Sequence, residues 1–200
     1  MKFTQLEIPG LVLCEPDVWK DERGFFKETF HAKKYAEAGI RKPFVQDNHS
    51  HSLKGVLRGL HYQKNHPQGK LVTAIRGEIY DVAVDLRRGS PAFGKSYGVL
   101  LTGENHKQLY VPEGCIHGFV VLSECADVLY KCTEIYVPSD DRGFIWNDPA
   151  FKIDWPLKEV SLSPKDAKLP RLADVAKSEL PLYAAEIRDA RSMLSGSNPL

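Results

Sequence analysis

Glycine and proline interrupt this chain about once every seven residues, with 15 glycines and 13 prolines among its 200 residues. Proline cannot donate the amide hydrogen bond of a helix interior, and glycine loses more backbone entropy on folding than any other residue. A bundle of long helices is therefore excluded. The segments between these breaks are short, and in several of them apolar residues alternate with polar ones, as in half-buried strands.

Residues 79–86 give the clearest example of this alternation. Every second side chain of an extended chain lies on the same face. One face would carry an apolar row and the other two carboxylates: Tyr80, Val82, Val84 and Leu86, against Asp81 and Asp85. Residues 108–112, 117–122 and 128–136 have a similar pattern. Many short strands with turn residues between them, and no alternating helices, predict an antiparallel sandwich, jelly roll or barrel.

Two short helices are expected beside the strands. Residues 32–38 end at Gly39, and glycine commonly follows a helix because it tolerates left-handed backbone angles. Residues 181–194 place apolar side chains on one helical stripe, which consists of Tyr183, Ile187, Ala190 and Leu194. A chain of this length forms one domain, or one domain with a small appendage.

The composition argues against several classes of partner. The chain has 27 basic and 26 acidic residues, so no net field would attract nucleic acid or a membrane surface. Its first residues lack the apolar core of a secretion signal, and no apolar stretch reaches transmembrane length. The four cysteines show no Cys-x-x-Cys spacing, which favours buried free thiols in a reducing compartment. We therefore expect a cytoplasmic protein without nucleic-acid or membrane partners.

Three segments have spacings that resemble the two sequence motifs of cupins: Gly55-x5-His61-x-Gln63, Lys70-x6-Gly77 and Pro112-x-Gly-x2-His117. In metal-binding cupins these motifs supply three histidines and a glutamate. Here Gln63 and Lys70 occupy two of the four ligand positions. An ammonium group repels a divalent cation, and two imidazoles alone form a poor site. The barrel is expected without a metal, since the alternative ligands His66 and His106 have loop-like surroundings.

A metal-free cavity with His61, Lys70 and Tyr130 suits proton abstraction beside a carbonyl group. Histidine, with an ordinary pKa of about 6.5, can act as the base near neutral pH. The Lys70 ammonium would stabilise the enolate. Tyr130, protonated until about pH 10, would return a proton to the opposite face of the substrate. These are the groups that an epimerase needs.

Strand geometry adds two expectations. Tyr130 and Tyr136 would share one face of a strand and lie roughly 20 Å apart, the length scale of an extended nucleotide sugar. Arg58 and His61 would fall on opposite faces of a regular strand. If both line the pocket, Gly59 should carry a β-bulge.

Taken together, these residues resemble the dTDP-4-dehydrorhamnose 3,5-epimerase family. The resemblance covers roughly residues 5–170 and rests on these segments, which stand in the family's order: DERGFFKETF, FVQDNHSHS, GVLRGLHYQ, QGKLV, DVAVDLRRGSPAFG, YVPEGCIHGFVVLS, LYKCTEIY, WNDP and LSPKDA. It implies an all-β fold, a cupin-like antiparallel jelly-roll barrel with a few short flanking helices. It also implies an isomerase that needs no metal or other cofactor. The epimerase domain would span residues 1–170, with residues 171–200 as a helical appendage of the same domain.

The family's substrate is a dTDP-4-keto-6-deoxy sugar, inverted at C3 and C5 in dTDP-L-rhamnose synthesis. By resemblance, His61 would be the base, Asp166 the carboxylate that orients it, Lys70 the enolate-stabilising cation and Tyr130 the acid. Without the family, Asp166 would be interpreted as a solvated loop residue. The implied substrate contacts are Arg23, Glu28, Gln46, Asn48, Arg58, His117, Tyr136, Asp141 and Lys165.

Two further points follow from the resemblance. Members of the family are homodimers in which the segment 23–28 can reach the partner's site, which would explain a polar motif so near the N-terminus. Tyr136 would stack on thymine. The segment 140–142, Asp-Asp-Arg, departs from the glutamate followed by glycine or serine that many relatives have.

Four other functions remain open at this point. The same catalytic residues would serve a 3- or 5-epimerase of a related deoxysugar pathway, and a sugar-nucleotide ketoisomerase would use a similar barrel. A metal-dependent oxygenase would contain stoichiometric iron, against which Gln63 and Lys70 argue. A non-catalytic nucleotide-sugar binding module would bind dTDP yet tolerate loss of His61 and Tyr130.

Overall fold

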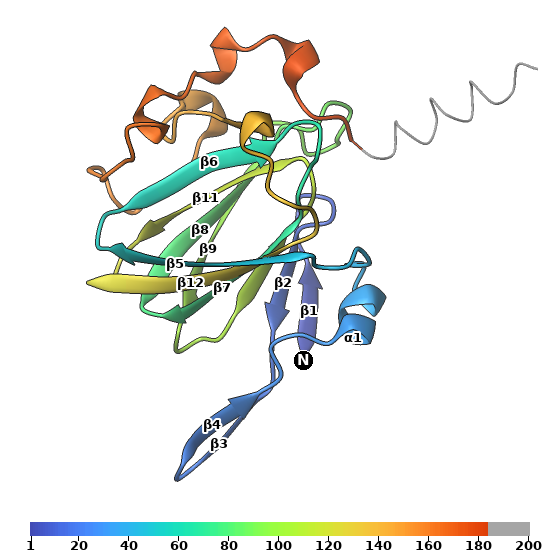
Figure 1. Ribbon diagram of the computed structural model, residues 1–200, viewed down its shortest axis with the longest axis vertical. Helices are drawn as coiled ribbons and strands as arrows, with labels where there is room; N and C mark the ends of the chain where they lie inside the picture. The colour runs from blue at the N-terminus through green and yellow to red at the C-terminus, as the bar shows by residue number, and fades with distance from the viewer. Residues whose placement is uncertain (184–200) are drawn as a thin grey trace, which may run out of the picture.

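A computed structural model describes residues 1–183, and two facing antiparallel sheets form most of it (Figure 1). The first sheet has the strand order β1-β2-β10-β7-β12-β5, with bounds Lys2–Gln5, Val12–Glu15, Gln108–Val111, Lys70–Arg76, Cys125–Cys132 and Gln46–Leu53. The second sheet has the order β13-β6-β11-β8-β9, with bounds Asp141–Gly143, Leu57–Gln63, Cys115–Val121, Glu78–Asp85 and Ser96–Thr102. This arrangement confirms the predicted all-β, jelly-roll class.

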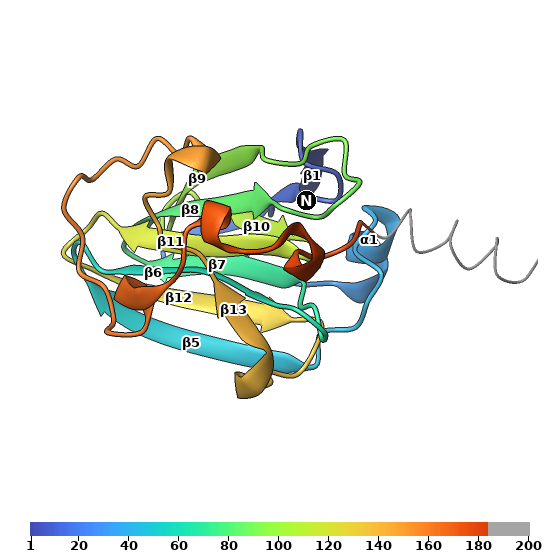
Figure 2. The same cartoon turned by 90° about the horizontal axis from the view of Figure 1, so that it is seen from above.

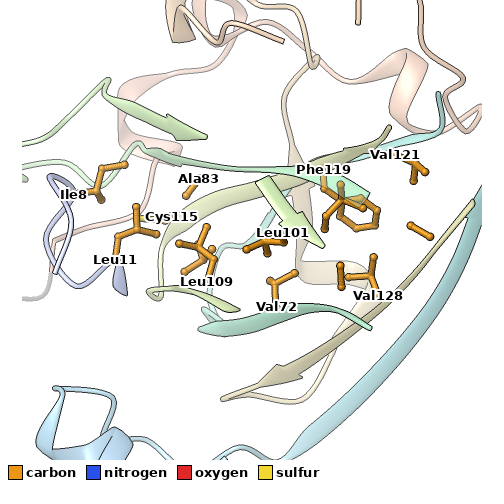
Figure 3. Close-up of a cluster of buried hydrophobic side chains, with 14 of the residues drawn as sticks. Ile8, Leu11, Val72, Ala83, Leu101, Leu109, Cys115, Phe119, Val121 and Val128 are labelled. Atoms are coloured by element: carbon orange, nitrogen blue, oxygen red, sulfur yellow. The ribbon is translucent and has the colours of Figure 1, made fainter. Parts of the chain in front are cut away.

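Apolar side chains from both sheets fill the space between them (Figure 3). Val72 and Val128 come from the first sheet, and Leu101 and Phe119 from the second. Burial of each such side chain contributes about 1.5–3 kcal/mol to folding. Phe119 and Tyr130 border both this core and a cavity described below, so the core forms one wall of that cavity.

The predicted apolar row of residues 79–86 packs on the outer face of the second sheet. There it meets the segment 144–180, which crosses that face (Figure 2) and contributes Phe151, Trp155 and Leu180. The segment contains the 3-10 turns η2 to η5, with bounds Pro149–Phe151, Asp166–Lys168, Leu172–Asp174 and Lys177–Glu179; η1 is Pro138–Asp140. The other face of β8 points inward, and both of its carboxylates are fully buried.

Helix α1, Ala32–Glu37, confirms the helix predicted at 32–38. Gly39 follows it with φ +98°, the left-handed angle expected at that position. The helix buries Tyr35 against the outer face of the first sheet. Before it, β3 (Val18–Asp21) and β4 (Gly24–Lys27) form a hairpin that projects from the body of the molecule (Figure 1).

The predicted free thiols are confirmed. None of the four cysteines forms a disulfide; Cys14, Cys115 and Cys132 are buried, and Cys125 is half-buried. Within residues 1–183, no helix has the length and apolar character needed to cross a membrane.

The strand expected over 128–136 is wrong in its length, because β12 ends at Cys132. The Thr133 amide still donates to the carbonyl of Gly69, the residue just before β7, over 3.0 Å. The reciprocal Gly69 amide, however, binds Thr133 Oγ1 over 2.8 Å instead of a backbone carbonyl. This side-chain bond ends the ladder and lets the chain leave the sheet.

The first residues of the helix expected over 181–194 are not helical. Leu182 forms a parallel bridge with Arg88, and the Tyr183 amide donates to the Arg88 carbonyl over 3.0 Å. Pairing with a neighbouring segment thus holds these residues extended. Residues 184–194 lie outside the described residues.

Candidate active site

A cavity of about 600 Å³ opens between the two sheets, within the usual size range of small-molecule sites. It collects most of the residues singled out in the sequence. The predicted residues that line it are Gln46, Asn48, Arg58, His61, Lys70, His117, Tyr130, Tyr136, Asp141, Lys165 and Asp166. Arg23 and Glu28 do not line it.

The first sheet supplies one wall of this cavity through β5, β12 and β7. Cys132 pairs with Gln46 on one side and with Lys70 on the other, and Tyr130 pairs with Asn48. Residues directly opposite each other in an antiparallel pair share a face, so the register brings these side chains together. Gln46 Nε2 donates to Asn48 Oδ1 over 2.9 Å, which fixes the two amides relative to each other.

The second sheet supplies the facing wall, and β6 carries the predicted bulge. His61 pairs with His117 and Arg58 with Phe119, so three residue steps on β6 match two steps on β11. The extra residue falls next to Gly59, which has φ +123°. Because of this bulge, Arg58 and His61 both line the cavity.

His61 and Asp166 form a hydrogen-bonded pair, with 2.8 Å between Nε2 and Oδ1. Asp166 is buried, and its second oxygen lies 3.5 Å from the Gly59 amide. Burial alone would raise the pKa of Asp166, but the His61 hydrogen bond and charge, with the Gly59 amide, hold it below its usual value. An ionised Asp166 fixes the proton on Nε2 and leaves Nδ1 as the basic nitrogen.

Lys70 and Tyr130 present polar groups that have no hydrogen-bond partner among residues 1–183. Burial lowers the pKa of Lys70, although the acidic groups around it, including Asp141 and Asp81, act in the opposite direction. Burial also raises the pKa of Tyr130, so its hydroxyl is protonated at neutral pH. A desolvated lysine and a free hydroxyl donor in one cavity suit a ligand that carries or develops negative charge.

Sequence reasoning missed the role of Asp81. Its Oδ1 lies 2.8 Å from His117 Nε2, and its Oδ2 is buried without a partner in the described part of the chain. The signal was present, because a carboxylate in a buried strand needs a hydrogen-bonding partner. The neighbouring strands β6 and β11 therefore each carry an imidazole paired with a carboxylate, His61 with Asp166 and His117 with Asp81.

Gln63, at one of the cupin ligand positions, supports a loop. Its Nε2 donates to the carbonyls of His66 and Ile135 over 2.7 and 3.1 Å, and its Oε1 accepts from the Val137 amide over 2.6 Å. These bonds use both ends of the amide. They also hold the chain on either side of Tyr136, a cavity residue.

The two histidines considered as substitute ligands do not reach the cavity. His66 Nδ1 lies 3.2 Å from Asp140 Oδ2, and His106 Nδ1 lies 3.1 Å from Lys27 Nζ. Over residues 1–183, no group of three or more His, Cys, Asp or Glu side chains has the spacing of a metal site. The imidazoles that do line the cavity are each already paired with a carboxylate.

Tyr136 reaches the rim of the cavity from the loop after β12, and not from the same strand as Tyr130. Its amide donates to Gln46 Oε1 over 2.8 Å, and its hydroxyl donates to Asp141 Oδ2 over 3.1 Å. Lys165 also pairs with Asp141, which raises the pKa of Lys165. The Tyr136 ring is 44% exposed, so a flat ligand can stack on it.

Arg23 and Glu28 lie at the two ends of strand β4, away from the cavity of their own chain. The Arg23 guanidinium binds Asp21, with 2.5 Å between Nη2 and Oδ2. Glu28 pairs with Lys34 of α1 over 2.7 Å.

Apart from Gln63, which the cupin spacing had placed at a ligand position, the remaining lining residues had not been predicted. They are Val56, Leu57, Tyr62, Gln68, Phe119, Ser161, Leu162 and Ser163. The apolar members look like ordinary core residues in the sequence. The segment 161–163 is brought in by long-range docking, since Ser161 forms a bridge with Val56.

Comparison with known proteins identifies the family of this chain. A family model described as dTDP-4-dehydrorhamnose 3,5-epimerase matches residues 5–174. The dTDP-4-dehydrorhamnose 3,5-epimerase of Pseudomonas aeruginosa is 54% identical over 176 residues, which cover 87% of this chain and 97% of the relative.

Solved structures have the same fold. The dTDP-6-deoxy-D-glucose-3,5-epimerase of Legionella pneumophila, in complex with dTDP-4-keto-L-rhamnose, gives a TM-score of 0.88 at 51% identity and covers 91% of this chain and 98% of its own. ChmJ, a 3'-monoepimerase from Streptomyces bikiniensis in complex with dTDP-quinovose, gives 0.85 at 32% identity, with coverages of 94% and 96%. The chain belongs to the dTDP-4-dehydrorhamnose 3,5-epimerase family.

Proposed function

We propose that this protein is a dTDP-4-dehydrorhamnose 3,5-epimerase that works without a metal. It converts dTDP-4-dehydro-6-deoxy-D-glucose to dTDP-4-dehydro-L-rhamnose in dTDP-L-rhamnose biosynthesis. The observation that carries the proposal is one cavity with the His61–Asp166 pair on one wall and the free Tyr130 hydroxyl and Lys70 ammonium on the other. The names of the similar proteins support the same reaction.

In the proposed reaction His61 removes a proton from C3 and, in a second round, from C5. Both protons are acidic because each carbon lies beside the C4 keto group. The electron pair of the broken C–H bond moves onto the keto oxygen, where the Lys70 ammonium stabilises the enolate. Tyr130 then delivers its proton to the opposite face of the carbon, which inverts the centre. Proton exchange with solvent restores His61 and Tyr130.

The other predicted residues are assigned to substrate binding. Tyr136, exposed at the rim, stacks on thymine. Arg58 and Lys165 provide positive charge for the diphosphate. The polar groups of Gln46, Asn48, His117 and Asp141 complete the contacts within the chain.

The active form in this proposal is a homodimer. The hairpin that carries Arg23 exposes three aromatic rings, Trp19, Phe25 and Phe26, by 56%, 57% and 71%. Such a group of exposed aromatic residues on a projecting hairpin is typical of a protein contact. We assign Arg23 and Glu28 to the cavity of the partner.

Two further assignments concern the domain organisation and the compartment. Leu172, Val175 and Leu180 pack on the second sheet, which favours residues 171–200 as an appendage of the same domain as residues 1–170. The buried free thiols favour a reducing compartment, in line with a cytoplasmic enzyme.

A single-centre epimerase of a related dTDP-deoxysugar pathway is the second candidate. It is favoured by the similarity to ChmJ, which is a 3'-monoepimerase with the same fold. Because one base and one acid can serve either outcome, the fold does not separate the two candidates.

Deuterium incorporation separates them. The protein is incubated with dTDP-4-keto-6-deoxyglucose in D₂O, and deuterium at C3 and C5 is read by mass spectrometry and NMR. Incorporation at both carbons supports the 3,5-epimerase, and incorporation at one carbon selects the second candidate. A protein that binds dTDP but incorporates deuterium at neither carbon contradicts both.

Two variants assign the roles in the same experiment. His61→Asn should abolish incorporation while dTDP still binds. Tyr130→Phe should retain incorporation but lose inversion, because the base can still return a solvent-derived proton to the original face.

A further inference from the structure

A series of hydrogen bonds outside the lining of the cavity holds the backbone just before β7. Gly69, directly before Lys70, donates its amide to Thr133 Oγ1 over 2.8 Å and accepts from the Thr133 amide over 3.0 Å. The Thr133 hydroxyl donates onward to Glu113 Oε1 over 2.8 Å. A hydroxyl can accept from one group while donating to another, so every hydrogen bond in this series has one donor and one acceptor. We refer to Gly69, Thr133 and Glu113 as the Gly69 clamp.

Glu113 is itself fixed at the far end of the clamp. Its Oε2 accepts from the Tyr110 hydroxyl over 3.2 Å, and its Oε1 lies 3.3 Å from Lys42 Nζ. Thr133 and Tyr110 are both buried. Loss of the Thr133 hydroxyl would therefore leave the Gly69 amide without an acceptor in a buried position, which is costly.

Glycine at position 69 permits the close packing of the clamp. A Cβ there would lie 2.5 Å from the Tyr110 hydroxyl oxygen and 3.1 Å from the Glu113 carboxyl carbon. The first contact is too short for any real side chain. The backbone just before Lys70 thus rests directly on the anchoring side chains.

The position of the Lys70 side chain depends on this backbone. Its ammonium has no hydrogen-bond or ion-pair partner within residues 1–183, so the backbone and the packing of the stem set its position. Gln68, on the other side of Gly69, also lines the cavity and donates to the Glu134 carbonyl over 2.6 Å. The clamp therefore joins the two segments from which Lys70 and Tyr136 enter the site.

We propose that Thr133 and Glu113 are positioning residues that hold Lys70 in register with the reacting keto group. This proposal rests on the proposed epimerase function and extends it to two side chains outside the lining of the cavity. Electrostatic stabilisation of an enolate requires the cation at a defined distance, and a displacement of about 1 Å can cost on the order of 100-fold in rate.

Thr133→Val tests the proposal, because it removes the hydroxyl and keeps the shape. We expect kcat to fall roughly tenfold or more, while KM for the nucleotide sugar changes by less than about twofold. Thr133→Ser restores the hydroxyl and should restore kcat.

Thr102→Val is the matched control. The Thr102 hydroxyl also accepts backbone amides at the end of a strand, those of Glu104 and Asn105, over 3.2 and 2.8 Å. It does not line the cavity. An unchanged kcat in Thr133→Val, or an equal fall in kcat in Thr102→Val, would overturn the proposal.

Hydrogen exchange tests the clamp independently of turnover. The amides of residues 69–71 should exchange roughly tenfold faster in Thr133→Val, but not in Thr133→Ser or Thr102→Val. Unchanged exchange there would overturn the clamp whatever the activity. If the exchange pattern is seen but the wild type does not turn over the substrate, the epimerase assignment fails and the clamp stands.

Discussion

Burial moves the ionisable groups of the cavity away from their ordinary behaviour in different directions. It lowers the pKa of Lys70 and raises that of Tyr130. At Asp166 burial also raises the pKa, but the hydrogen bond and charge of His61, together with the Gly59 amide, outweigh it and leave the pKa below its usual value. Tyr130 therefore remains a proton donor and Asp166 an anion, which are the states that the proposed reaction uses. Burial disfavours the charged form of Lys70 at a cost in stability, because no protein group in the described chain pairs with it.

The cost at Lys70 leads to a prediction for Lys70→Met, which keeps the stem and removes the charge. Activity should fall by roughly 100- to 1,000-fold, the typical loss on removing an oxyanion-stabilising group. The variant should nevertheless unfold at a higher urea concentration than wild type at neutral pH, because it removes a group whose charged form the cavity disfavours. Steady-state kinetics and urea titration check the two halves of this prediction.

The stability that Lys70→Met gains over wild type should depend on pH in a direction set by the lowered pKa of Lys70. A lysine with a lowered pKa in the folded state binds its proton more tightly when unfolded, so wild-type stability recovers as pH rises through the folded pKa toward about 10.4. The advantage of the variant should therefore shrink between neutral and alkaline pH. Lys95→Met, at an exposed position, serves as the control and should change stability by less than about 0.5 kcal/mol at either pH. A destabilised Lys70→Met would contradict the argument.

Asp166→Asn should lower kcat by roughly 100- to 10,000-fold, because an amide can donate to His61 Nε2 and trap the wrong tautomer. The lowered pKa of Asp166 also stabilises wild type above its unfolded value of about 3.9, and that contribution is lost as pH falls through the folded pKa. The difference in Tm between wild type and variant should therefore narrow below about pH 4. A constant difference across that range would show that the His61–Asp166 pair does not stabilise the fold electrostatically.

At the scale of elements, sequence pattern predicted most of what local geometry controls. The alternation in residues 79–86, the helix ended by Gly39 and the bulge near Gly59 each follow from periodicity or backbone chemistry, and each is confirmed. The end of β12 was not predictable in this way, because a side chain of Thr133 replaces a carbonyl in the ladder.

Long-range docking explains the other omissions. Asp166 lies in a 3-10 turn about 100 residues from its partner, and only the family resemblance indicated its place. Asp81 was visible as a carboxylate on a strand, but its partner His117 lies on another strand. Pairings between distant segments leave no periodic signal in either segment.

The bulge in β6 gives a prediction at this scale. In Gly59→Ala the new Cβ would lie 2.6 Å from Gly118 Cα and 2.8 Å from the His117 carbonyl oxygen, at φ +123°. We expect a loss of at least about 2 kcal/mol in unfolding free energy, from backbone strain and from the clash with β11. We expect kcat to fall by more than the loss of folded protein alone would cause, because His61 and His117 both shift. Thermal unfolding and kcat measure the two effects.

Gly94→Ala is the matched control for this prediction. Gly94 also has a positive φ, +81°, but a Cβ there meets nothing within 4 Å. Its substitution should cost only the backbone strain, roughly 1 kcal/mol, with kcat unchanged. Equal effects of the two variants would mean that the close approach of β6 and β11 contributes little.

At the scale of the whole molecule, two features of a single chain motivate the proposed dimer. Arg23 and Glu28 do not line the cavity, while the hairpin that holds Arg23 stands away from the body (Figure 1). The aromatic residues of this hairpin are exposed. A twofold dimer in which each hairpin serves the other cavity would satisfy both features. Phe26→Ser should then lower the mass in solution from twice the 22.5 kDa chain mass toward that of one chain, whereas Phe93→Ser, at an exposed site in a turn, should not.

Complementation between two inactive variants tests whether Arg23 acts in the partner's site. In Arg23→Ala the cavity keeps its own His61 but receives no arginine, and in His61→Asn the cavity receives the arginine but has no base. A mixed dimer contains one complete site, formed by the Arg23→Ala chain's cavity and the arginine of the His61→Asn chain. Random co-assembly at equal amounts makes half of the dimers mixed, so activity should recover to on the order of a quarter of wild type. Activity can recover only in dimers that contain one chain of each variant, so the activity of each variant purified alone is the baseline. If co-expression restores nothing while mixed dimers are present, Arg23 acts within its own chain or not at all.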